Sequence, residues 1–253
     1  MSENHQNLNA KMEPAQHRWK HAANIRAVIF DLDDTLWPII PLIHDAEQAL
    51  FNWLQTNAPK IVGQHSIESL RRLRQQLIPA NPRFSFDLWA LRHAMLTQLF
   101  ATGEPDPQRV KNLADNAMQV FARARNRVSL YDDVIPALTE LGQRFKLGSI
   151  SNGFADLEQI GLARHFHVSL AAHEFGSAKP DPRIFQAACA SLGVALHEAI
   201  YVGDDVVIDV QGARRAGLHS VWINRATHMR APRDHEADFE CRDLAELTRW
   251  LQT

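Results

Sequence analysis

Three carboxylates follow a short apolar run near the start of the chain. The run from Ile25 to Phe30 is rich in β-branched residues, which is typical of a buried parallel strand, and Asp31, Asp33 and Asp34 come next. Side chains alternate along an extended chain, so Asp31 and Asp33 would point the same way. Two such charges require a divalent cation or a shared proton. Turn and capping roles remain the alternative for this stretch taken alone.

Polar residues also follow two later apolar segments. The first group is a hydroxyl, an amide and a glycine, the second is a pair of carboxylates, and a lysine lies between the two groups ahead of a predicted helix. Because the carboxyl ends of parallel strands meet at one edge of a sheet, we expect these groups to form one site that binds both a cation and an anion. Such a site suits a phosphate ester bound with Mg²⁺. The residues are Ser151, Asn152, Gly153, Lys179, Asp204 and Asp205.

The elements that would position these residues alternate between helices and short strands from Val128 onward. This alternation is typical of crossover units on a parallel sheet, and the first strand must join that sheet because a lone strand cannot bury both faces. The predicted strands are 25–30, 147–150, 168–171, 199–202 and 220–223, and the predicted helices are 134–141, 155–160, 181–192, 208–216 and 244–251.

The segment between the first strand and Val128 contains no convincing strand. Apolar residues at helical spacing, separated by proline and glycine, predict four helices. We therefore expect an α/β fold, a doubly wound, Rossmann-like parallel sheet with an inserted four-helix domain. The predicted helices are 43–54, 67–78, 86–100 and 110–121; the predicted parts are a mobile polar tail at 1–22, a core at 23–38 and 128–253, and the insertion at 39–127.

The composition excludes several classes of protein. The chain has 253 residues, 45% of them hydrophobic, which is enough for a sizeable core, and a formal net charge of -2, which does not favour a nucleic-acid or membrane surface partner. Its two cysteines, Cys189 and Cys241, give neither a disulfide framework nor a zinc spacing. No signal peptide or membrane span is apparent, so we expect a cytoplasmic location.

Taken together, the polar groups resemble the four motifs of the haloacid dehalogenase (HAD) superfamily in its phosphatase form. The resemblance runs from about Ile25 to Ile223, and the family inserts a helical cap just after the first motif, where the four helices are predicted here. The motifs are Asp31-Leu32-Asp33-Asp34-Thr35, then Ser151 in Ile150-Ser151-Asn152-Gly153, then Lys179-Pro180, and finally Gly203-Asp204-Asp205 with the later Asp209.

The resemblance implies a mechanism and a metal. Asp31 would attack phosphorus and form an aspartyl-phosphate, and Asp33 would act first as the acid and then as the base. Mg²⁺ would be held by the Asp31 carboxylate, the Asp33 backbone carbonyl and Asp204. Ser151 and Lys179, with the backbone at Asn152 and Gly153, would bind the phosphate oxygens.

Two acidic residues of the fourth motif have open roles. Asp205 is expected either to bind the metal through water or to pair with Lys179. Asp209 would support the metal site or simply favour the dipole of the helix that it begins.

Several functions within the family remain open. The family's dehalogenases lack an acid two residues after the nucleophile, so Asp33 favours phosphoryl transfer, although a phosphosugar mutase or a non-catalytic phosphate sensor would keep the same residues. Residues 202–217 are similar to bacterial phosphatases that act on flavin mononucleotide and on 5-amino-6-(5-phosphoribitylamino)uracil in riboflavin biosynthesis. The expected partner is a small phosphorylated metabolite, and the chain would act as a monomer or homodimer.

Substrate choice would depend on the cap, which is expected to close over the strand ends. Trp37, Phe84 and Trp89 could stack on a planar ring, and packing inside the cap explains the same aromatics equally well. Six arginines are expected on exposed faces of the helices, with contact to an anionic substrate as the alternative. They are Arg71, Arg72, Arg74, Arg123, Arg125 and Arg127.

Overall fold

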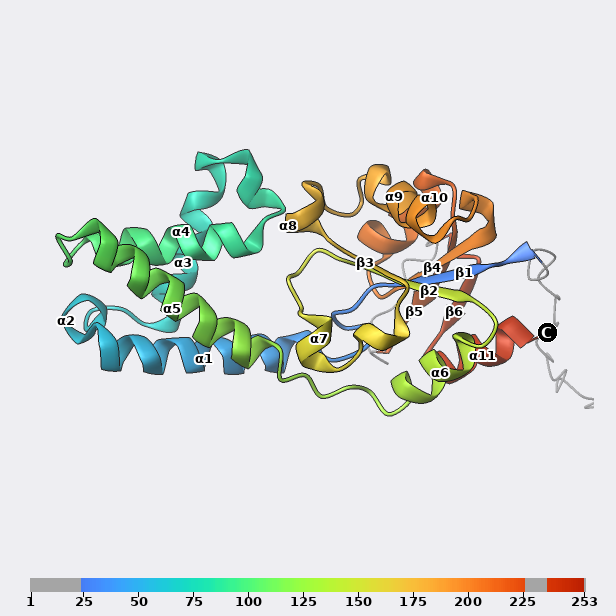
Figure 1. The fold of residues 1–253 in the computed structure, drawn as a ribbon, viewed down its shortest axis with the longest axis horizontal. Helices are drawn as coiled ribbons and strands as arrows, with labels where there is room; N and C mark the ends of the chain where they lie inside the picture. The colour runs from blue at the N-terminus through green and yellow to red at the C-terminus, as the bar shows by residue number, and fades with distance from the viewer. Residues whose placement is uncertain (1–23, 226–235, 253) are drawn as a thin grey trace, which may run out of the picture.

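The chain folds around a six-stranded, all-parallel sheet, described by a computed structural model that covers residues 24–225 and 236–252 (Figure 1). The predicted tail at 1–22 lies outside the described residues. The strand order is β3-β2-β1-β4-β5-β6, which confirms the predicted α/β class with a parallel sheet. The strands are β1 (Ala27–Phe30), β2 (Lys146–Ser151), β3 (Val168–Ala171), β4 (Ala199–Gly203), β5 (His219–Ile223) and β6 (Phe239–Cys241).

The first strand lies at the centre of this sheet. In β1 every residue is buried, and Phe30 aligns with Ser149 of β2 on one side and with Val202 of β4 on the other. This register brings the residues after β1, β2 and β4 to one edge. The sheet order reverses at β1, which is where open α/β sheets bind their ligands.

Helices cover both faces of the sheet (Figure 1). One face packs against α9 and α10, the other against α6 and α11, and each face has its own group of buried apolar side chains. The predicted helix at 208–216 is instead a π-helix, η6 (Val206–Val210), that continues into α10. The core helices are α6 (Val134–Leu141), α7 (Leu157–Ile160), α8 (Ala172–Phe175), α9 (Pro182–Leu192), α10 (Gln211–Ala216) and α11 (Leu244–Gln252).

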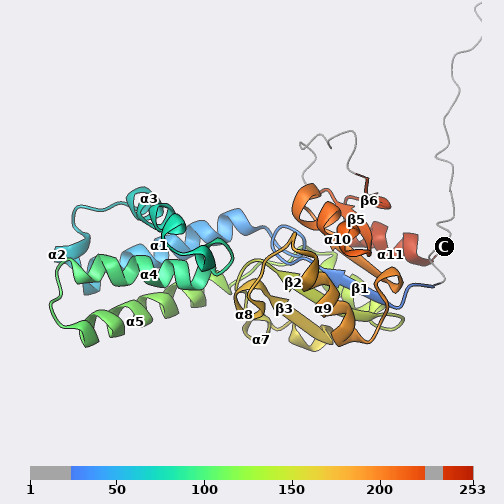
Figure 2. The same ribbon diagram turned by 90° about the horizontal axis from the view of Figure 1, so that it is seen from above.

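The helices between β1 and α6 form a bundle that extends away from the sheet (Figures 1 and 2). A group of buried residues, including Leu54, Phe100 and Phe121, gives this cap a hydrophobic core of its own. Two of the six arginines, Arg71 and Arg74, are hydrogen-bonded to the buried Glu47 at 2.7 and 3.3 Å. The cap helices are α1 (Ile39–Asn57), α2 (Pro59–Val62), α3 (Ile67–Leu77), α4 (Leu88–Ala101) and α5 (Pro107–Arg125), with short 3₁₀ turns at Ile78–Ala80 and Pro82–Ser85.

The two chain segments that join the cap to the core are tied to each other. The backbone N–H of Tyr131, which follows the cap, donates to the carbonyl of Leu36, which precedes it, at 3.1 Å. The entry and exit of the insertion therefore share one place beside the end of β1. Among the described residues, no helix is long and apolar enough to cross a membrane.

We predict that Leu54→Ala lowers the free energy of unfolding by about 2–5 kcal/mol, because the Leu54 side chain is fully buried in the cap core and its truncation leaves a cavity. Denaturant unfolding measures the change. The neighbouring Gln55 of α1 is exposed, so Gln55→Ala is the matched control and should change the stability little. Equal stability of the two variants would contradict the independent packing of the cap.

Candidate active site

A buried lysine lies among the carboxylates at the carboxyl edge of the sheet. The Lys179 ammonium donates to Asp31 Oδ1 and, at 2.8 Å in each case, to Asp209 Oδ1 and to the Tyr201 hydroxyl oxygen. The side chain of Lys179 is only 2% exposed. Residues from β1, from β4 and η6, and from the loop before α9 therefore meet at one nitrogen atom.

The environment of Lys179 keeps it charged. Burial lowers the pKa of this lysine, but the negative charges of Asp209 and Asp31 outweigh that effect and raise the pKa above its usual value. Burial raises the pKa of the Tyr201 phenol, so the phenol stays neutral and donates to the carbonyl of Ile150 at 3.1 Å. Tyr201 was not predicted as a site residue, because a tyrosine inside an apolar strand gives no sequence signal of such a role.

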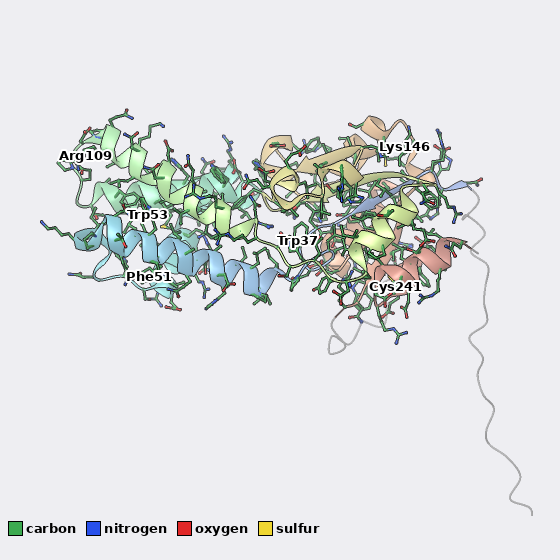
Figure 3. The ribbon with its side chains drawn as sticks, turned by 60° about the horizontal axis from the view of Figure 1, so that its bottom comes forward. Trp37, Phe51, Trp53, Arg109, Lys146 and Cys241 are labelled. Atoms are coloured by element: carbon green, nitrogen blue, oxygen red, sulfur yellow. The ribbon has the colours of Figure 1, made fainter. Side chains whose placement is uncertain are left out.

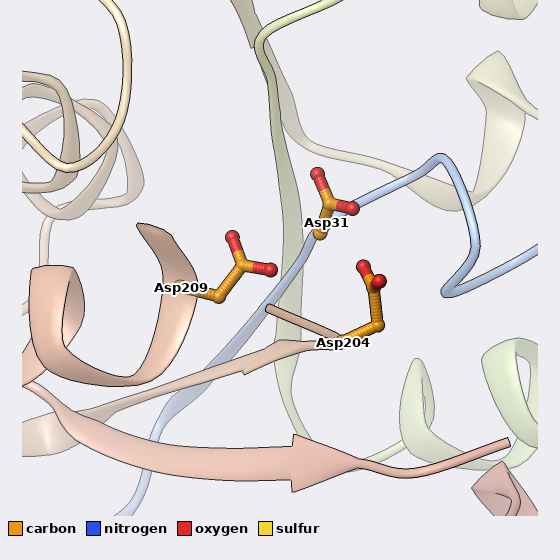
Figure 4. A group of neighbouring side chains, drawn as sticks. All are labelled: Asp31, Asp204 and Asp209. Carbon is orange, nitrogen blue, oxygen red and sulfur yellow. The ribbon is translucent and has the colours of Figure 1, made fainter. Parts of the chain in front are cut away.

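Asp31, Asp204 and Asp209 converge from three elements, as Figure 4 shows. One carboxylate oxygen of each lies within 4.8 Å of one from each of the others, so the group could hold a metal ion. Both carboxylate oxygens of Asp209 already accept hydrogen bonds. Its Oδ1 accepts from Lys179, and its Oδ2 accepts from the backbone N–H of Asp205 at 3.0 Å. Asp31 keeps its Oδ2 for a cation, since its Oδ1 accepts from Lys179, and Asp204 offers its carboxylate, one oxygen of which lies 3.5 Å from the Thr35 hydroxyl.

The pKa values of these two carboxyl groups also fit a cation. Burial raises the pKa of Asp31 well above its ordinary value, against the opposing charge of Lys179, and the charges of Asp209 and Asp204 raise it further. Burial, followed by the charges of Asp209 and Asp34, raises the pKa of Asp204 to about 7. More negative charge is gathered here than Lys179 alone balances, and oxygen ligands of this kind suit Mg²⁺.

The remaining acid of the fourth motif has a structural task. Asp205 accepts hydrogen bonds from the backbone N–H groups of Val207 and Ile208 at 2.7 and 2.8 Å, so it caps η6. Asp209 is the residue of this segment that pairs with Lys179. Gly203 must be small here, because a Cβ atom at this position would lie 2.4 Å from the carboxyl carbon of Asp209.

The residues after β2 line the same edge. The buried Ser151 accepts from the backbone N–H of Gly153 at 2.9 Å, which leaves the serine hydroxyl hydrogen free to donate to a substrate oxygen. The Asn152 side chain accepts from the backbone N–H of Lys179 at 2.8 Å and donates to its carbonyl at 3.0 Å. Asn152 therefore joins the loop after β2 to the loop that carries Lys179.

Asp33 does not share the environment of Asp31. Its Oδ1 accepts from the indole N–H of Trp37 at 2.7 Å, and Arg125 Nη2 lies 2.6 and 2.7 Å from its two carboxylate oxygens. The expectation that Arg125 lies on an exposed face of the cap is wrong, because the side chain is only 2% exposed and α5 ends against the loop that follows β1. The pairing joins residues 92 positions apart, so no local pattern predicts it.

A cleft of about 720 Å³ opens beside Ser151, and its lining does not include Asp31, Lys179 or Asp204. Trp89 of the cap and Phe154 and His173 of the core line it, and their rings, in contact one after the other, form what we call its aromatic wall. The rings of Trp89 and Phe154 meet edge to face, with centroids 5.4 Å apart. Of the other predicted substrate contacts, Trp37 is completely buried where cap and core meet (Figure 3), and Phe84 lies in the 3₁₀ turn Pro82–Ser85.

We predict that a divalent cation binds more weakly below neutral pH. The Asp204 carboxyl, with its pKa of about 7, is protonated below that pH and must lose its proton before it can bind a cation. Calorimetric titration with Mg²⁺ should show an affinity that falls as the pH is lowered through neutrality, because protons on the carboxyl ligands must be released before the cation binds. Asp204→Asn should remove most of the affinity. An affinity independent of pH would contradict this assignment.

We predict that Asn152→Ala lowers the free energy of unfolding by about 1–3 kcal/mol, because both hydrogen bonds to the backbone of Lys179 are lost. Asn152→Asp keeps the acceptor oxygen but sets a second carboxylate oxygen against the Lys179 carbonyl, so it should not restore the lost stability. Denaturant unfolding of the two variants gives the comparison. If the alanine variant is as stable as the wild type, Asn152 does not hold the two loops together.

The chain is similar to known phosphatases and to a known dehalogenase. The chain is 31% identical over 205 residues to the 5-amino-6-(5-phospho-D-ribitylamino)uracil phosphatase YigB of Escherichia coli, covering 81% of this chain and 86% of that one. It is 33% identical over 244 residues to the glyceraldehyde 3-phosphate phosphatase of Methanopyrus kandleri, covering 90% and 98%. A crystal structure of 2-haloacid dehalogenase from Pseudomonas syringae pv. tomato superposes with a TM-score of 0.85 at 37% identity, covering 90% and 98%.

The family model described as haloacid dehalogenase-like hydrolase matches residues 25–217, which run from the first strand of the sheet to the end of α10. This range includes the strand ends that carry Asp31, Ser151 and Asp204, together with the whole of the cap. The chain belongs to the haloacid dehalogenase-like hydrolases.

Proposed function

We propose that this protein is a Mg²⁺-dependent phosphomonoester hydrolase that cleaves a small phosphorylated metabolite through an aspartyl-phosphate on Asp31. The observation that carries the proposal is the meeting of Asp31 with the Lys179 ammonium and the Asp204 carboxylate at the carboxyl edge of the sheet. A carboxylate between a buried cation and a metal-binding group can approach a phosphoryl group whose negative charge is neutralised on both sides.

Each residue has a distinct task in the proposed reaction. An oxygen of Asp31 attacks phosphorus while Ser151 and Lys179 donate to the phosphoryl oxygens, and the bond from phosphorus to the ester oxygen breaks. Asp33, which accepts from Arg125 and Trp37 in this structure, must carry a proton when the ester is bound, and it gives that proton to the departing alkoxide. It then takes a proton from the water that hydrolyses the aspartyl-phosphate, so it ends the cycle protonated as it began.

Mg²⁺ would be held by the Asp31 carboxylate, the Asp33 carbonyl and Asp204, and it would neutralise phosphate charge. Asp204 is positioned for this task by two neighbours. The indole N–H of Trp222 donates to its backbone carbonyl at 2.7 Å, and the Thr35 hydroxyl donates to its carboxylate at 3.5 Å.

The leaving group would occupy the cleft beside Ser151. Its aromatic wall of Trp89, Phe154 and His173 suits a planar ring, which flavin mononucleotide and 5-amino-6-(5-phosphoribitylamino)uracil both possess. The similarity to the Escherichia coli enzyme supports the second of these and a role in riboflavin biosynthesis. The two buried free cysteines suit the cytoplasm, and one chain, as a monomer or in a homodimer, carries every residue that the reaction uses.

Dehalogenation is the second candidate, because the superposed structure from Pseudomonas syringae is that of a 2-haloacid dehalogenase. A carbon–halogen bond gives a leaving halide that needs no proton. Asp33, which Trp37 and Arg125 hold in place, would then have no role as a general acid. The presence of this acid favours phosphoryl transfer.

We predict that the purified protein hydrolyses para-nitrophenyl phosphate with Mg²⁺ and loses this activity with a chelator. Asp31→Asn should lower kcat by at least about a thousandfold, because the nucleophile is lost. The carboxylate of Asp45 in α1 is 80% exposed, so Asp45→Asn is the matched control and should retain activity. Full activity of Asp31→Asn would refute the mechanism.

A panel of substrates separates the candidates. We expect release of phosphate from flavin mononucleotide or 5-amino-6-(5-phospho-D-ribitylamino)uracil to be faster than from glyceraldehyde 3-phosphate or glucose phosphates. Equal turnover of all these esters would contradict the aromatic preference of the cleft. Release of halide from 2-chloropropionate without Mg²⁺ would establish the dehalogenase instead.

A further inference from the structure

Arg125 is the last residue of α5 and the point at which a cap helix touches the catalytic loop. Its Nη2 atom lies 2.6 Å from Asp33 Oδ1 and 2.7 Å from Asp33 Oδ2. The guanidinium also lies over the ring of Trp37, with its central carbon 5.9 Å from the ring centroid. Arg125 and Trp37 together therefore hold the Asp33 carboxyl from two sides.

The Asp33 carboxyl lies against residues 151–153, the segment that we propose to bind the phosphate. A Cβ atom at Gly153 would lie 2.9 Å from Asp33 Oδ2, 3.3 Å from Arg125 Nη2 and 3.3 Å from Ser151 Oγ. Glycine at this position lets the carboxyl approach the backbone beside Ser151. Asp33 thus lies beside the segment that we propose to bind the phosphate, and Arg125 holds it there.

The positive charge of Arg125 is paired with Asp33. Its guanidinium is buried, its Nη1 atom has no hydrogen-bond partner among the described residues, and its ion pair is with Asp33. A buried ion pair is weak support for stability, because desolvation offsets most of the Coulombic gain. An apolar side chain would join α5 to the core at least as well, so the arginine calls for a reason that involves Asp33 itself.

We propose that Arg125 is a positioning residue that holds the Asp33 carboxyl where it can exchange a proton with the leaving group. The inference rests on the proposed phosphatase function and adds a residue to it. Arg125 belongs to the cap and Asp33 to the core, so the residue that positions the acid comes from the inserted helices.

The test compares two phosphate esters of similar shape whose leaving groups differ in how much they need a proton. Phenoxide requires a proton to leave, whereas para-nitrophenoxide leaves readily without one. The ratio kcat/KM reports only the steps up to formation of the aspartyl-phosphate, so it isolates the acid role of Asp33. Arg125→Met should lower kcat/KM for phenyl phosphate by about a hundredfold and that for para-nitrophenyl phosphate by less than about tenfold.

Four further variants test whether the effect is specific to the pairing of Arg125 with Asp33. Asp33→Asn should show the same dependence on the leaving group, and Arg125→Met combined with Asp33→Asn should lose no more than Asp33→Asn alone. Arg125→Lys keeps the charge and should recover part of the activity toward phenyl phosphate. Arg123 is exposed on the same helix, so Arg123→Met is the control and should match the wild type with both esters.

The outcomes separate the inference from the proposed function. Equal losses with both esters, in Arg125→Met and in Arg125→Lys, would show that Arg125 acts on folding or on binding and would overturn the inference while leaving the phosphatase intact. Additive losses in the double variant would overturn it as well. Failure of the wild type to hydrolyse either ester with Mg²⁺ would overturn the proposed function, and the inference with it.

Discussion

The site depends on the burial of a lysine among carboxylates. Lys179 is almost inaccessible to water, and its ammonium is compatible with that burial because Asp31 and Asp209 accept its hydrogen bonds. Removing one partner of such a group typically costs about 3–5 kcal/mol, because an uncompensated buried charge remains. Lys179, Asp31 and Asp209 come from three separate segments, so this balance also fixes how β1, β4 and the loop before α9 meet.

The acidic residues of the site differ in their hydrogen-bond partners. Asp209 accepts from Lys179 and from a backbone N–H, and Asp205 caps the π-helix. Asp31 and Asp204 keep oxygens that are not used in this way, at the edge of the sheet where a phosphate could approach. Asp33, only two residues from Asp31, is held by Arg125 and Trp37 instead, so neighbouring carboxylates in the sequence acquire separate environments.

Much of the fold could be predicted from the sequence, because buried parallel strands and their polar ends are local signals. The runs before Asp31, Ser151 and Asp204 are strands, and they meet as expected. The edge strand β6 was missed because it is three residues long and partly exposed. Tyr201 and Arg125 were also missed as site residues, because their roles come from partners 22 to 92 positions away, where spacing carries no information.

The backbone hydrogen bond between Tyr131 and Leu36 has a consequence for how the sequence of the cap can change. Since the inserted helices leave and rejoin the sheet at a single anchor and carry their own hydrophobic interior, mutations can accumulate in them without disturbing the strand ends. The contact between α5 and the loop after β1 limits that freedom, because the last turn of α5 must still meet Asp33.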